Sequence, residues 1–379
     1  MNFDFDSDQK ALKDQARRFL ADVCPLSSVR EILDHPELTH SEKLWSQLGE
    51  QGWCGTAIPE QYGGLAFGYV ELCALAEELG RAVAPTPFSS SVYQFAEAVL
   101  AAGNEAQKQA LLPRIATGEL IGTIAFSEGP GVLRSEGVTT RFENGALNGQ
   151  KIPVTDGSIA DQAVVLASHA TGTGLYLVDL KQDGVTRQSV ATVDPTRDAA
   201  RLRFDHAEAE PLGDAERGLE QLLRIQDKAA VLLAFEQLGG ADRALEMARD
   251  YALERFAFGR QIGSYQAIKH KLADVFTKIE VARANAYFGA WALSSDAPEL
   301  SVAAAAARVA ASDAFWFASK ENIQTHGGIG FTWEADCHLL YRRARQLGLV
   351  IGAPRDWKRR LAAALEAQRD AEKTAMGAL

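Results

Sequence analysis

The chain has 379 residues, 47% of them hydrophobic and 23% charged, with a formal net charge of -11 at pH 7. This length and composition predict a globular protein of two or three domains with a sizeable buried core. The negative charge argues against a nucleic-acid partner, because nucleic-acid-binding proteins usually present a basic face. No apolar run approaches the roughly 20 residues of a membrane-spanning helix, so we expect no membrane span.

The N-terminal segment and the cysteines favour a cytoplasmic protein. Residues 1–10 are acidic and lack the basic start and apolar core of a signal peptide. The four cysteines lie far apart and show neither a CxxC pair nor a Cys/His metal spacing: Cys24, Cys54, Cys73 and Cys337. We therefore expect reduced thiols and no metal site.

Residues 1–120 predict an N-terminal helical domain. Apolar residues recur at three- and four-residue spacing over residues 8–23, 40–52, 69–83 and 100–115. The sequence IPEQYGG at residues 58–64 predicts a turn-rich connection between the second and third of these helices.

Residues 121–212 predict a middle β-domain. Turn residues separate short runs of β-forming residues at 122–126, 138–142, 163–167, 175–180 and 201–204. Asn144-Gly145 predicts a hairpin between Phe142 and Leu147, because both turn positions tolerate positive φ. The short, closely spaced strands predict a small antiparallel β-barrel, with a sandwich as the alternative.

Residues 213–379 predict a C-terminal helical bundle. Long segments rich in Ala and Leu cover residues 219–251, 265–294, 301–325 and 357–373. Helices this long pack together, so we expect a four-helix bundle. The order helical, β, helical is an uncommon α+β arrangement and narrows the choice of fold.

The first candidate site is ERFAFGRQIG at residues 254–263, followed by Gln266, between two of the long predicted helices. Arg255 offers a planar fork of donors that suits phosphate oxygens. Phe258 beside Gly259 lets an aromatic ring pack where the backbone approaches a ligand closely. A helix-linking loop with solvated arginines is the alternative.

The second candidate site is QTHGGIGF at residues 324–331. Its glycines, at the end of a predicted helix, leave backbone amides open to a phosphate. It does not follow a strand, as a dinucleotide-binding GxGxxG loop does. A helix C-cap with a glycine turn is the alternative, and His326 alone is interpreted as a packing residue rather than a catalytic one.

Together these segments resemble the acyl-CoA dehydrogenase family, and the resemblance covers the whole chain. It rests on an Arg-x-x-Phe-Gly turn with a Gln eleven residues after the Arg, and on a Gln-x-x-Gly-Gly turn near the end of the chain. Further matching segments are IPEQYGG at residues 58–64, AFSE at residues 125–128, NGQK at residues 148–151 and YRRAR at residues 341–345.

The resemblance implies an FAD-dependent enzyme of fatty-acid or steroid side-chain β-oxidation, which oxidises an acyl-CoA thioester and passes electrons to an electron-transferring flavoprotein. In this family a carboxylate removes the α-proton while a hydride leaves the β-carbon, and the thioester carbonyl must be polarised. Subunits assemble as tetramers, in which the two helical turns contact a neighbour's FAD. The residues that match those contacts are Arg255, Phe258, Gln266, Gln324 and Gly328.

In the β-domain, the family positions near the flavin match Ser127 and Thr155, but two neighbouring features depart from the family. Pro153 stands where members often have a tryptophan that shields the flavin ring. The loop after Ser127 reads EGPGVLR at residues 128–134 instead of the common Glu-Pro-x-x-Gly-Ser. Both departures weigh against flavin binding by this chain's own β-domain.

The family's catalytic base has no evident counterpart. The usual Glu position falls at Ile351, and the position that a minority of members use falls at Ala229. Neither side chain accepts a proton. Two acids on the same predicted helix are candidates: Glu236 lies two turns after Ala229 on a similar face, and Asp227 lies on a different side, where solvent exposure also explains it.

These residues favour a subunit that completes a shared FAD site in a heteromeric acyl-CoA dehydrogenase, beside a catalytic paralogue that supplies the base. The resemblance extends to α2β2 complexes with one degenerate subunit. The alternatives are a self-sufficient homotetramer that uses Asp227 or Glu236, a non-catalytic scaffold that binds CoA or flavin, and a flavin monooxygenase-like relative.

Overall fold

Internal packing divides the protein into two compact units, as seen in a computed structural model that describes residues 5–131 and 133–377. We call them the helical unit (residues 1–26, 73–84 and 230–379) and the sheet unit (residues 27–72 and 85–229). The helices before residue 120 are shared between the two units. The domain bounds inferred from the sequence at residues 120 and 212 therefore stay a prediction.

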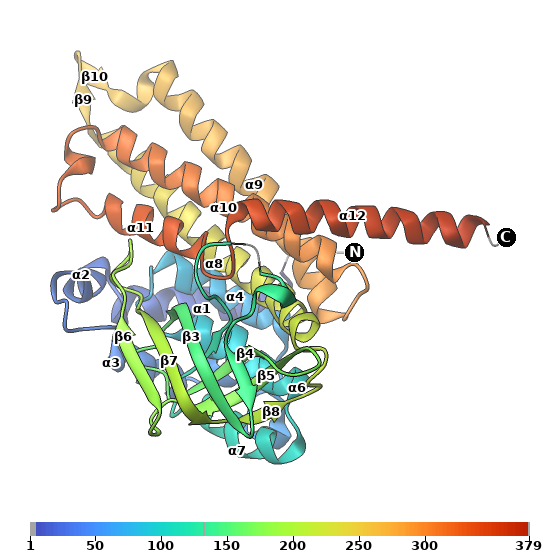
Figure 1. The fold of residues 1–379 in the computed structure, drawn as a ribbon. Helices are drawn as coiled ribbons and strands as arrows, with labels where there is room; N and C mark the ends of the chain where they lie inside the picture. The colour runs from blue at the N-terminus through green and yellow to red at the C-terminus, as the bar shows by residue number, and fades with distance from the viewer. Residues whose placement is uncertain (1–4, 132, 378–379) are drawn as a thin grey trace. The chain divides into compact units, whose positions relative to one another are not determined.

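The helical unit consists of long helices and one short hairpin (Figure 1). Its elements are α1 (Ser7–Val23), most of α4 (Tyr69–Arg81) and of α8 (Gly218–Glu254), β9 (Phe256–Ala257), β10 (Arg260–Gln261), η5 (Ile262–Ser264), α9 (Gln266–Ser294), α10 (Leu300–His326), η6 (Ile329–Phe331), α11 (Cys337–Leu347) and α12 (Pro354–Gly377). All four long C-terminal helices expected from the sequence are present as α8, α9, α10 and α12. The sequence did not predict α11, which is short and carries three arginines in eleven residues.

The sheet unit contains one β-sheet and short helices. Its elements are α2 (Leu26–Asp34), α3 (Glu42–Glu50), η1 (Trp53–Gly55), η2 (Glu60–Tyr62), α5 (Phe88–Ser90), the π-helical η3 (Ser91–Ala96), α6 (Glu97–Ala102), α7 (Glu105–Ala116), β1 (Gly122–Ala125), η4 (Ser135–Gly137), β2 (Arg141–Glu143), β3 (Ala146–Thr155), β4 (Gln162–Ser168), β5 (Thr173–Asp179), β6 (Val185–Ser189), β7 (Ala199–Glu208) and β8 (Glu210–Leu212). The strands β6 and β8 were not predicted.

The single helix expected over residues 100–115 is interrupted in the structure by a helix cap. This segment forms two helices, because α6 ends before Gly103 and α7 begins after Asn104. The Asn104 side chain accepts the backbone amide of Gln107 at 2.9 Å, and the Gln107 side chain accepts the amide of Asn104 at 3.0 Å. This reciprocal cap starts a new helix although the apolar spacing continues across the break.

The strands form an open sheet, so the predicted closed antiparallel β-barrel is wrong. The strand order is β6-β7-β3-β2-β4-β5-β8, with β1 paired to β4 beside this path. Both β1 and β2 run parallel to β4, which makes the sheet mixed. Short strands in a sequence indicate a β-domain, whereas closure depends on pairing between the outermost strands, which local pattern does not encode.

The strand β4 lies between two apolar clusters of the sheet unit. Val164 and Leu166 belong to a cluster that includes residues of α6 and α7. Ala163, Val165 and Ala167 belong to a second cluster with residues of β3 and β7. Successive strand residues point to opposite faces, which explains how one strand serves both clusters.

The predicted hairpin at Asn144-Gly145 is confirmed. These residues have φ values of 53° and 81° and join β2 to β3, where Glu143 pairs with Ala146. Positive φ at both positions matches a type I′ turn, whose twist suits the flanking strands.

Two glycines bring α4 and α8 into close contact within the helical unit. A Cβ atom added to Gly80 would lie 1.7 Å from the carbonyl oxygen of Glu236, and one added to Gly239 would lie 1.7 Å from that of Glu77. No side chain fits at these distances, so a larger residue must push the helices apart.

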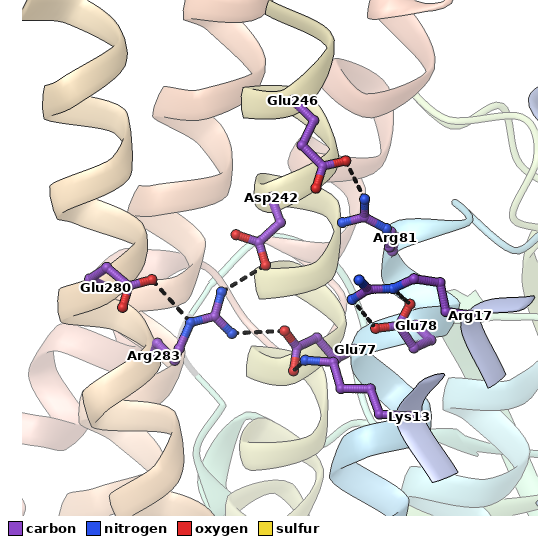
Figure 2. Close-up of polar contacts among 9 residues, drawn as sticks. All are labelled: Lys13, Arg17, Glu77, Glu78, Arg81, Asp242, Glu246, Glu280 and Arg283. Carbon is purple, nitrogen blue, oxygen red and sulfur yellow. Dashed lines mark hydrogen bonds and ion pairs between the residues drawn. The ribbon is translucent and has the colours of Figure 1, made fainter. Parts of the chain in front are cut away.

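A buried ion-pair network links four helices of the helical unit (Figure 2). Glu77 of α4 is 2% exposed and contacts Lys13 of α1 at 2.6 Å and Arg283 of α9 at 2.7 Å. Arg283 also contacts Asp242 of α8 at 2.7 Å. Burial alone would raise the pKa of Glu77, but the two cations outweigh it and hold this pKa below its usual value. Further pairs are Arg17–Glu78 and Arg81–Glu246.

Among the residues that the structure describes, α10 alone is long and apolar enough to cross a membrane. However, 56% of its apolar window is buried inside the protein. One such helix is weak evidence for a membrane span, because a core helix satisfies the same criterion.

Candidate functional site

The predicted connection around Arg255 is a β-hairpin of the helical unit. Strands β9 and β10 pair in antiparallel fashion, with Arg260 opposite Ala257. Between them, Phe258 and Gly259 have φ values of 52° and 80°. Phenylalanine seldom adopts positive φ, so the structure holds this side chain in a strained backbone conformation at the tip of the hairpin.

Contacts at the base of the hairpin fix its shape. The amide of Ile262 donates to the carbonyl of Arg255 at 2.8 Å, and the Tyr265 hydroxyl donates to the carbonyl of Ala257 at 2.9 Å. The Arg260 guanidinium lies 3.9 Å from the centroid of the Tyr265 ring, a cation–π contact. The backbone that carries Arg255 is therefore held in place.

The outer side chains of the hairpin face away from the protein. Phe258 is 97% exposed and Phe256 is 61% exposed. Arg255 and Gln266 are exposed too, and Arg255 forms no ion pair with the residues that the structure describes. A strained, exposed aromatic beside an unpaired guanidinium indicates a surface that another molecule covers.

The second predicted turn, at the C-terminal end of α10, is equally open. Gln324, Gly327 and Gly328 are exposed, and Gly327 has a φ of 62°. His326 bonds through Nδ1 to the carbonyl of Asn322 at 2.9 Å. The Gly327 amide donates to the carbonyls of Ile323 and Gln324 at 3.1 and 3.2 Å, so the segment is a helix C-terminus with a glycine turn, as the alternative interpretation of the sequence proposed.

An aromatic contact joins the two turns. The His326 ring stacks on Tyr251, near the end of α8, with centroids 4.2 Å apart and planes at 25°. Tyr251 accepts the Arg255 amide through its carbonyl at 2.8 Å. The ends of α8 and α10 are therefore neighbours, and His326 is a packing residue.

The combined surface carries donors that suit the phosphate oxygens of a ligand. These donors are the guanidinium of Arg255 and the side-chain amides of Gln266 and Gln324, all of them exposed. A Cβ atom added at Gly259, Gly327 or Gly328 would meet no atom within 4 Å. A ligand therefore has room to approach the backbone at all three positions.

In the sheet unit, Thr155 ends β3 and its backbone is firmly held. The Thr123 hydroxyl donates to the Thr155 carbonyl at 2.6 Å. The next residue, Asp156, is 1% exposed, accepts the Ser90 hydroxyl at 2.6 Å and lies 3.6 Å from Arg197. The sequence did not single out this buried pair, although an acid directly after a β-forming run was the available signal.

Ser127 begins a loop that Glu128 anchors. The Ser127 hydroxyl donates to a carbonyl of its own loop at 3.3 Å. The Glu128 carboxylate accepts the amides of Thr139 and Thr140 at 2.7 and 2.9 Å and the Lys151 ammonium at 2.6 Å. The loop departs from the family pattern after residue 128, but Glu128 still attaches it to β3.

The pair formed by Glu128 and Lys151 has perturbed ionisation. The Lys151 side chain is 0% exposed, and burial lowers its pKa to about 8 although Glu128 opposes this shift. Burial would raise the pKa of Glu128, but hydrogen bonds from Lys151 and Thr139 hold it at about 2. The sequence marked Lys151 only as part of a family segment, so its burial was not foreseen.

Residues of the sheet unit fit a flavin ring incompletely. Pro153 stands at the shielding position, where the pairing of β3 with β7 shifts register between Lys151 and Val154. Thr155 is half-buried and Ser127 bonds within its own loop. This side of the chain offers the hydroxyls of Ser127 and Thr155, with a proline at the position where members often have a tryptophan.

The two positions expected for a catalytic base are apolar and buried. Ile351 of the helical unit is 2% exposed, and its carbonyl accepts the Trp357 indole N–H at 3.2 Å. Ala229 of the sheet unit is 0% exposed. Neither position presents an acid, as the sequence predicts.

The two candidate acids on α8 are both buried. Asp227 is 7% exposed, which corrects the expectation that solvent exposure explains it, and Glu236 is 4% exposed. Glu236 lies near Arg308, a 1% exposed guanidinium that donates to the Gln237 side chain at 2.8 Å. Burial lowers the pKa of Arg308 to about 9, partly opposed by the charge of Glu236.

Sequence comparison identifies the class of protein that this fold and site define. Residues 6–119 match the family described as acyl-CoA dehydrogenase, N-terminal domain, and residues 216–355 match acyl-CoA dehydrogenase, C-terminal domain. Members are FAD-dependent oxidoreductases. Acyl-CoA dehydrogenase IpdE2 from Mycobacterium tuberculosis is 37% identical over 323 residues, which cover 85% of this chain and 86% of that relative. The chain belongs to the acyl-CoA dehydrogenase family.

Solved structures agree with this assignment. The ChsE4–ChsE5 complex from Mycobacterium tuberculosis has a TM-score of 0.87 at 25% identity, covering 97% of this chain and 99% of that chain. A variant of the Tcur3481–Tcur3483 steroid ACAD has a TM-score of 0.87 at 29% identity, covering 96% of this chain and 99% of that chain. The family resemblance stated from the sequence is therefore confirmed.

Proposed function

We propose that this chain is a subunit of a heteromeric acyl-CoA dehydrogenase and completes the FAD site of a partner subunit that carries the catalytic base. One observation carries the proposal: the hairpin with Phe258 97% exposed and the exposed glycine turn start from neighbouring helix ends, which the stacking of Tyr251 on His326 joins. Apolar residues at Ile351 and Ala229 support it, because this chain lacks an acid where the family uses one.

In this proposal the chain's own residues bind and orient rather than react. Arg255 neutralises phosphate charge, and the exposed glycine turn at Gly327 and Gly328 lets a phosphate approach the backbone closely. FAD, when bound, supplies the hydride acceptor for α,β-desaturation of the acyl-CoA thioester, and an electron-transferring flavoprotein takes the electrons. A similar solved structure is named as a steroid ACAD, which supports a bulky acyl group as the substrate.

Purification of the chain alone and together with a co-expressed family paralogue tests the assembly. Absorbance near 450 nm reports bound flavin, and its bleaching by an acyl-CoA reports turnover. We expect little flavin on the chain alone and full flavin with turnover in the complex. Full flavin occupancy and turnover by the chain alone would contradict the proposal.

That contrary outcome would favour the self-sufficient homotetramer, and substitutions would then identify its base. Asp227→Asn and Glu236→Gln would each be assayed for flavin bleaching, and the variant that abolishes it marks the acid. A scaffold that only binds CoA or flavin predicts ligand binding without flavin reduction in every preparation.

Substitution of Arg255 tests its role in FAD binding. Arg255→Ala removes a charge-assisted hydrogen bond to phosphate, so we expect the dissociation constant of FAD from the complex to rise about 10- to 100-fold, from about 1.5–3 kcal/mol per such bond. Flavin fluorescence on release measures it. Arg249→Ala is the matched control, because Arg249 is exposed on α8, the helix that ends just before Arg255, and pairs with Asp250. Equal effects of the two substitutions would contradict the role.

A further inference from the structure

A pocket of about 160 Å³ lies within the helical unit, where α11 and the start of α12 pack on α10. Its apolar lining includes Trp316 of α10, Ala344 of α11 and Pro354 of α12. The exposed cations Arg345 and Lys358 line it as well. A cavity of about 150 Å³ holds one benzene ring, so this pocket has room for one small ring.

The indole of Trp316 forms an aromatic wall of the pocket and is held by two residues of α11. The Tyr341 ring lies against it, with centroids 4.8 Å apart and planes at 37°. The Arg345 guanidinium lies 5.8 Å from the centroid of the Trp316 ring, a cation–π contact. Trp316 is only half-buried, so part of its ring is open to a flat ligand that stacks on it.

The most buried polar side chain of the pocket is Ser312, which is 7% exposed. Buried neighbours hold it in place: Arg308 donates to Gln237 Oε1 at 2.8 Å, and Gln237 Nε2 donates to Ser312 Oγ at 3.1 Å. Arg308 also donates to the Leu347 carbonyl, which ties the end of α11 to the same network. The Ser312 hydroxyl can direct its hydrogen to Gln237 Oε1, at 3.3 Å, or to a ligand. The pocket therefore has a fixed polar group inside it.

The charges at the pocket leave an excess of positive charge. Its one acid, Asp313, pairs with Lys278 at 2.9 Å and is thereby compensated. Arg345 and Lys358 form no ion pair with any residue that the structure describes. The whole chain has a net charge of -11, so two uncompensated cations at one pocket attract an anion to this particular place.

We propose that this pocket binds a small organic anion that contains one flat ring. The ring stacks on Trp316, and the anionic group accepts hydrogen bonds from Arg345 and Lys358. A volume of about 160 Å³ suits one ring with its anionic group and is too small for a whole nucleotide. The site is thus separate from the turns at Arg255 and Gly328, which do not line the pocket. Aromatic carboxylates and aryl phosphates share the required chemistry.

Fluorine NMR of para-fluorobenzoate mixed with the full chain tests the binding. We expect saturable line broadening with a dissociation constant of about 0.1–1 mM, as suits a ligand of this size. The neutral para-fluorobenzamide should bind about 10-fold more weakly, because it cannot form charge-assisted hydrogen bonds. Equal affinity for acid and amide, or no saturable binding up to about 10 mM, overturns the proposal.

Competition with unlabelled anions distinguishes the two sources of the anionic group. Displacement of para-fluorobenzoate by both benzoate and phenyl phosphate supports a site for aryl anions of either kind. Displacement by benzoate alone supports a site for carboxylates. Displacement by inorganic phosphate as strongly as by either aryl anion overturns the role of the ring.

Substitutions locate the bound ring. The double variant Arg345→Gln/Lys358→Gln removes both cations and Trp316→Leu removes the aromatic wall, so each should raise the dissociation constant of para-fluorobenzoate about 10-fold. Arg359→Gln is the matched control, because Arg359 is exposed on α12 and does not line the pocket. Far-UV circular dichroism confirms the fold of each variant. Unchanged binding in the double variant, or an equal loss in Arg255→Ala, overturns the proposal, and the latter would place the anion at the proposed FAD contacts.

Discussion

At the residue scale, buried charges are the features of this protein that depend most on a specific partner. Lys151 is 0% exposed and its carboxylate partner is Glu128, which also receives two backbone amides. The loop after Ser127 is thereby tied to β3 by one ion pair. Removing one member of a buried pair costs more than removing both, because the remaining charge has no counter-charge.

This asymmetry gives a stability prediction for the pair. Glu128→Gln leaves the Lys151 ammonium buried without a carboxylate, and we expect the free energy of unfolding to fall by about 3 kcal/mol. The double variant Glu128→Gln/Lys151→Met should recover part of that loss. Urea unfolding followed by fluorescence measures both. Additive losses in the double variant would show that the two side chains do not depend on each other.

The ionisation of Glu128 predicts how that loss depends on pH. Its pKa is about 2 in the folded protein and 4.5 in the unfolded chain, so the unfolded state binds more protons between these values. The stabilisation is complete above pH 4.5 and is lost as pH falls toward 2. The difference in unfolding free energy between wild type and Glu128→Gln should therefore shrink below pH 4.5. A difference that stays constant from pH 7 to pH 3 would contradict this assignment.

At the element scale, ion pairs join α1, α4, α8 and α9 next to a place where two glycines let α4 and α8 approach closely. Gly80 and Gly239 let α4 and α8 touch backbone to backbone, which leaves no space there for apolar side chains. The ion pairs around Glu77 connect the same helices beside this contact (Figure 2). The network thus stabilises the packing of these helices at a place where few side chains can pack.

Removal of its central cation tests this contribution. Arg283→Met takes away contacts to Glu77, Asp242 and Glu280, and we expect a loss of about 2 kcal/mol in unfolding free energy because buried Glu77 keeps only Lys13 as its counter-charge. Arg359→Met is the control, since Arg359 is an exposed member of a helical pair with Asp356, and should cost under about 0.5 kcal/mol. Thermal unfolding compares them, and equal losses would show that the network adds nothing.

At the scale of the whole molecule, the net charge of -11 affects how copies assemble. Two identical acidic chains repel each other, and salt screens this repulsion as the Debye length falls from about 30 Å at 0.01 M to 10 Å at 0.1 M. We expect any association between copies of the chain to tighten with added salt, because salt weakens the repulsion that opposes it. Sedimentation equilibrium at 20 and 200 mM NaCl measures this. Weaker association at high salt would point to an interface held by ion pairs instead.

Local pattern predicted the elements whose signal is contained in a short stretch of chain. The helices α8, α9, α10 and α12 followed from apolar spacing, and the β2–β3 hairpin followed from Asn144-Gly145. The sequence did not predict the capped break at Asn104, because the apolar pattern continues across it. It did not predict the short helix α11 either, because a high charge content obscures its apolar spacing. The site motifs were readable because each lies in one turn.

The sequence alone therefore determined the family, the candidate FAD contacts and the absence of an acid at Ile351 and Ala229. Only the tertiary structure decided that the sheet is open, that Asp227 and Lys151 are buried, and that the turns at Arg255 and Gly328 are neighbours. The physical reason is the distance along the chain between the residues that specify each feature. A turn or helix is specified by residues a few positions apart, whereas burial and proximity depend on segments that are distant in the chain and meet only when it folds.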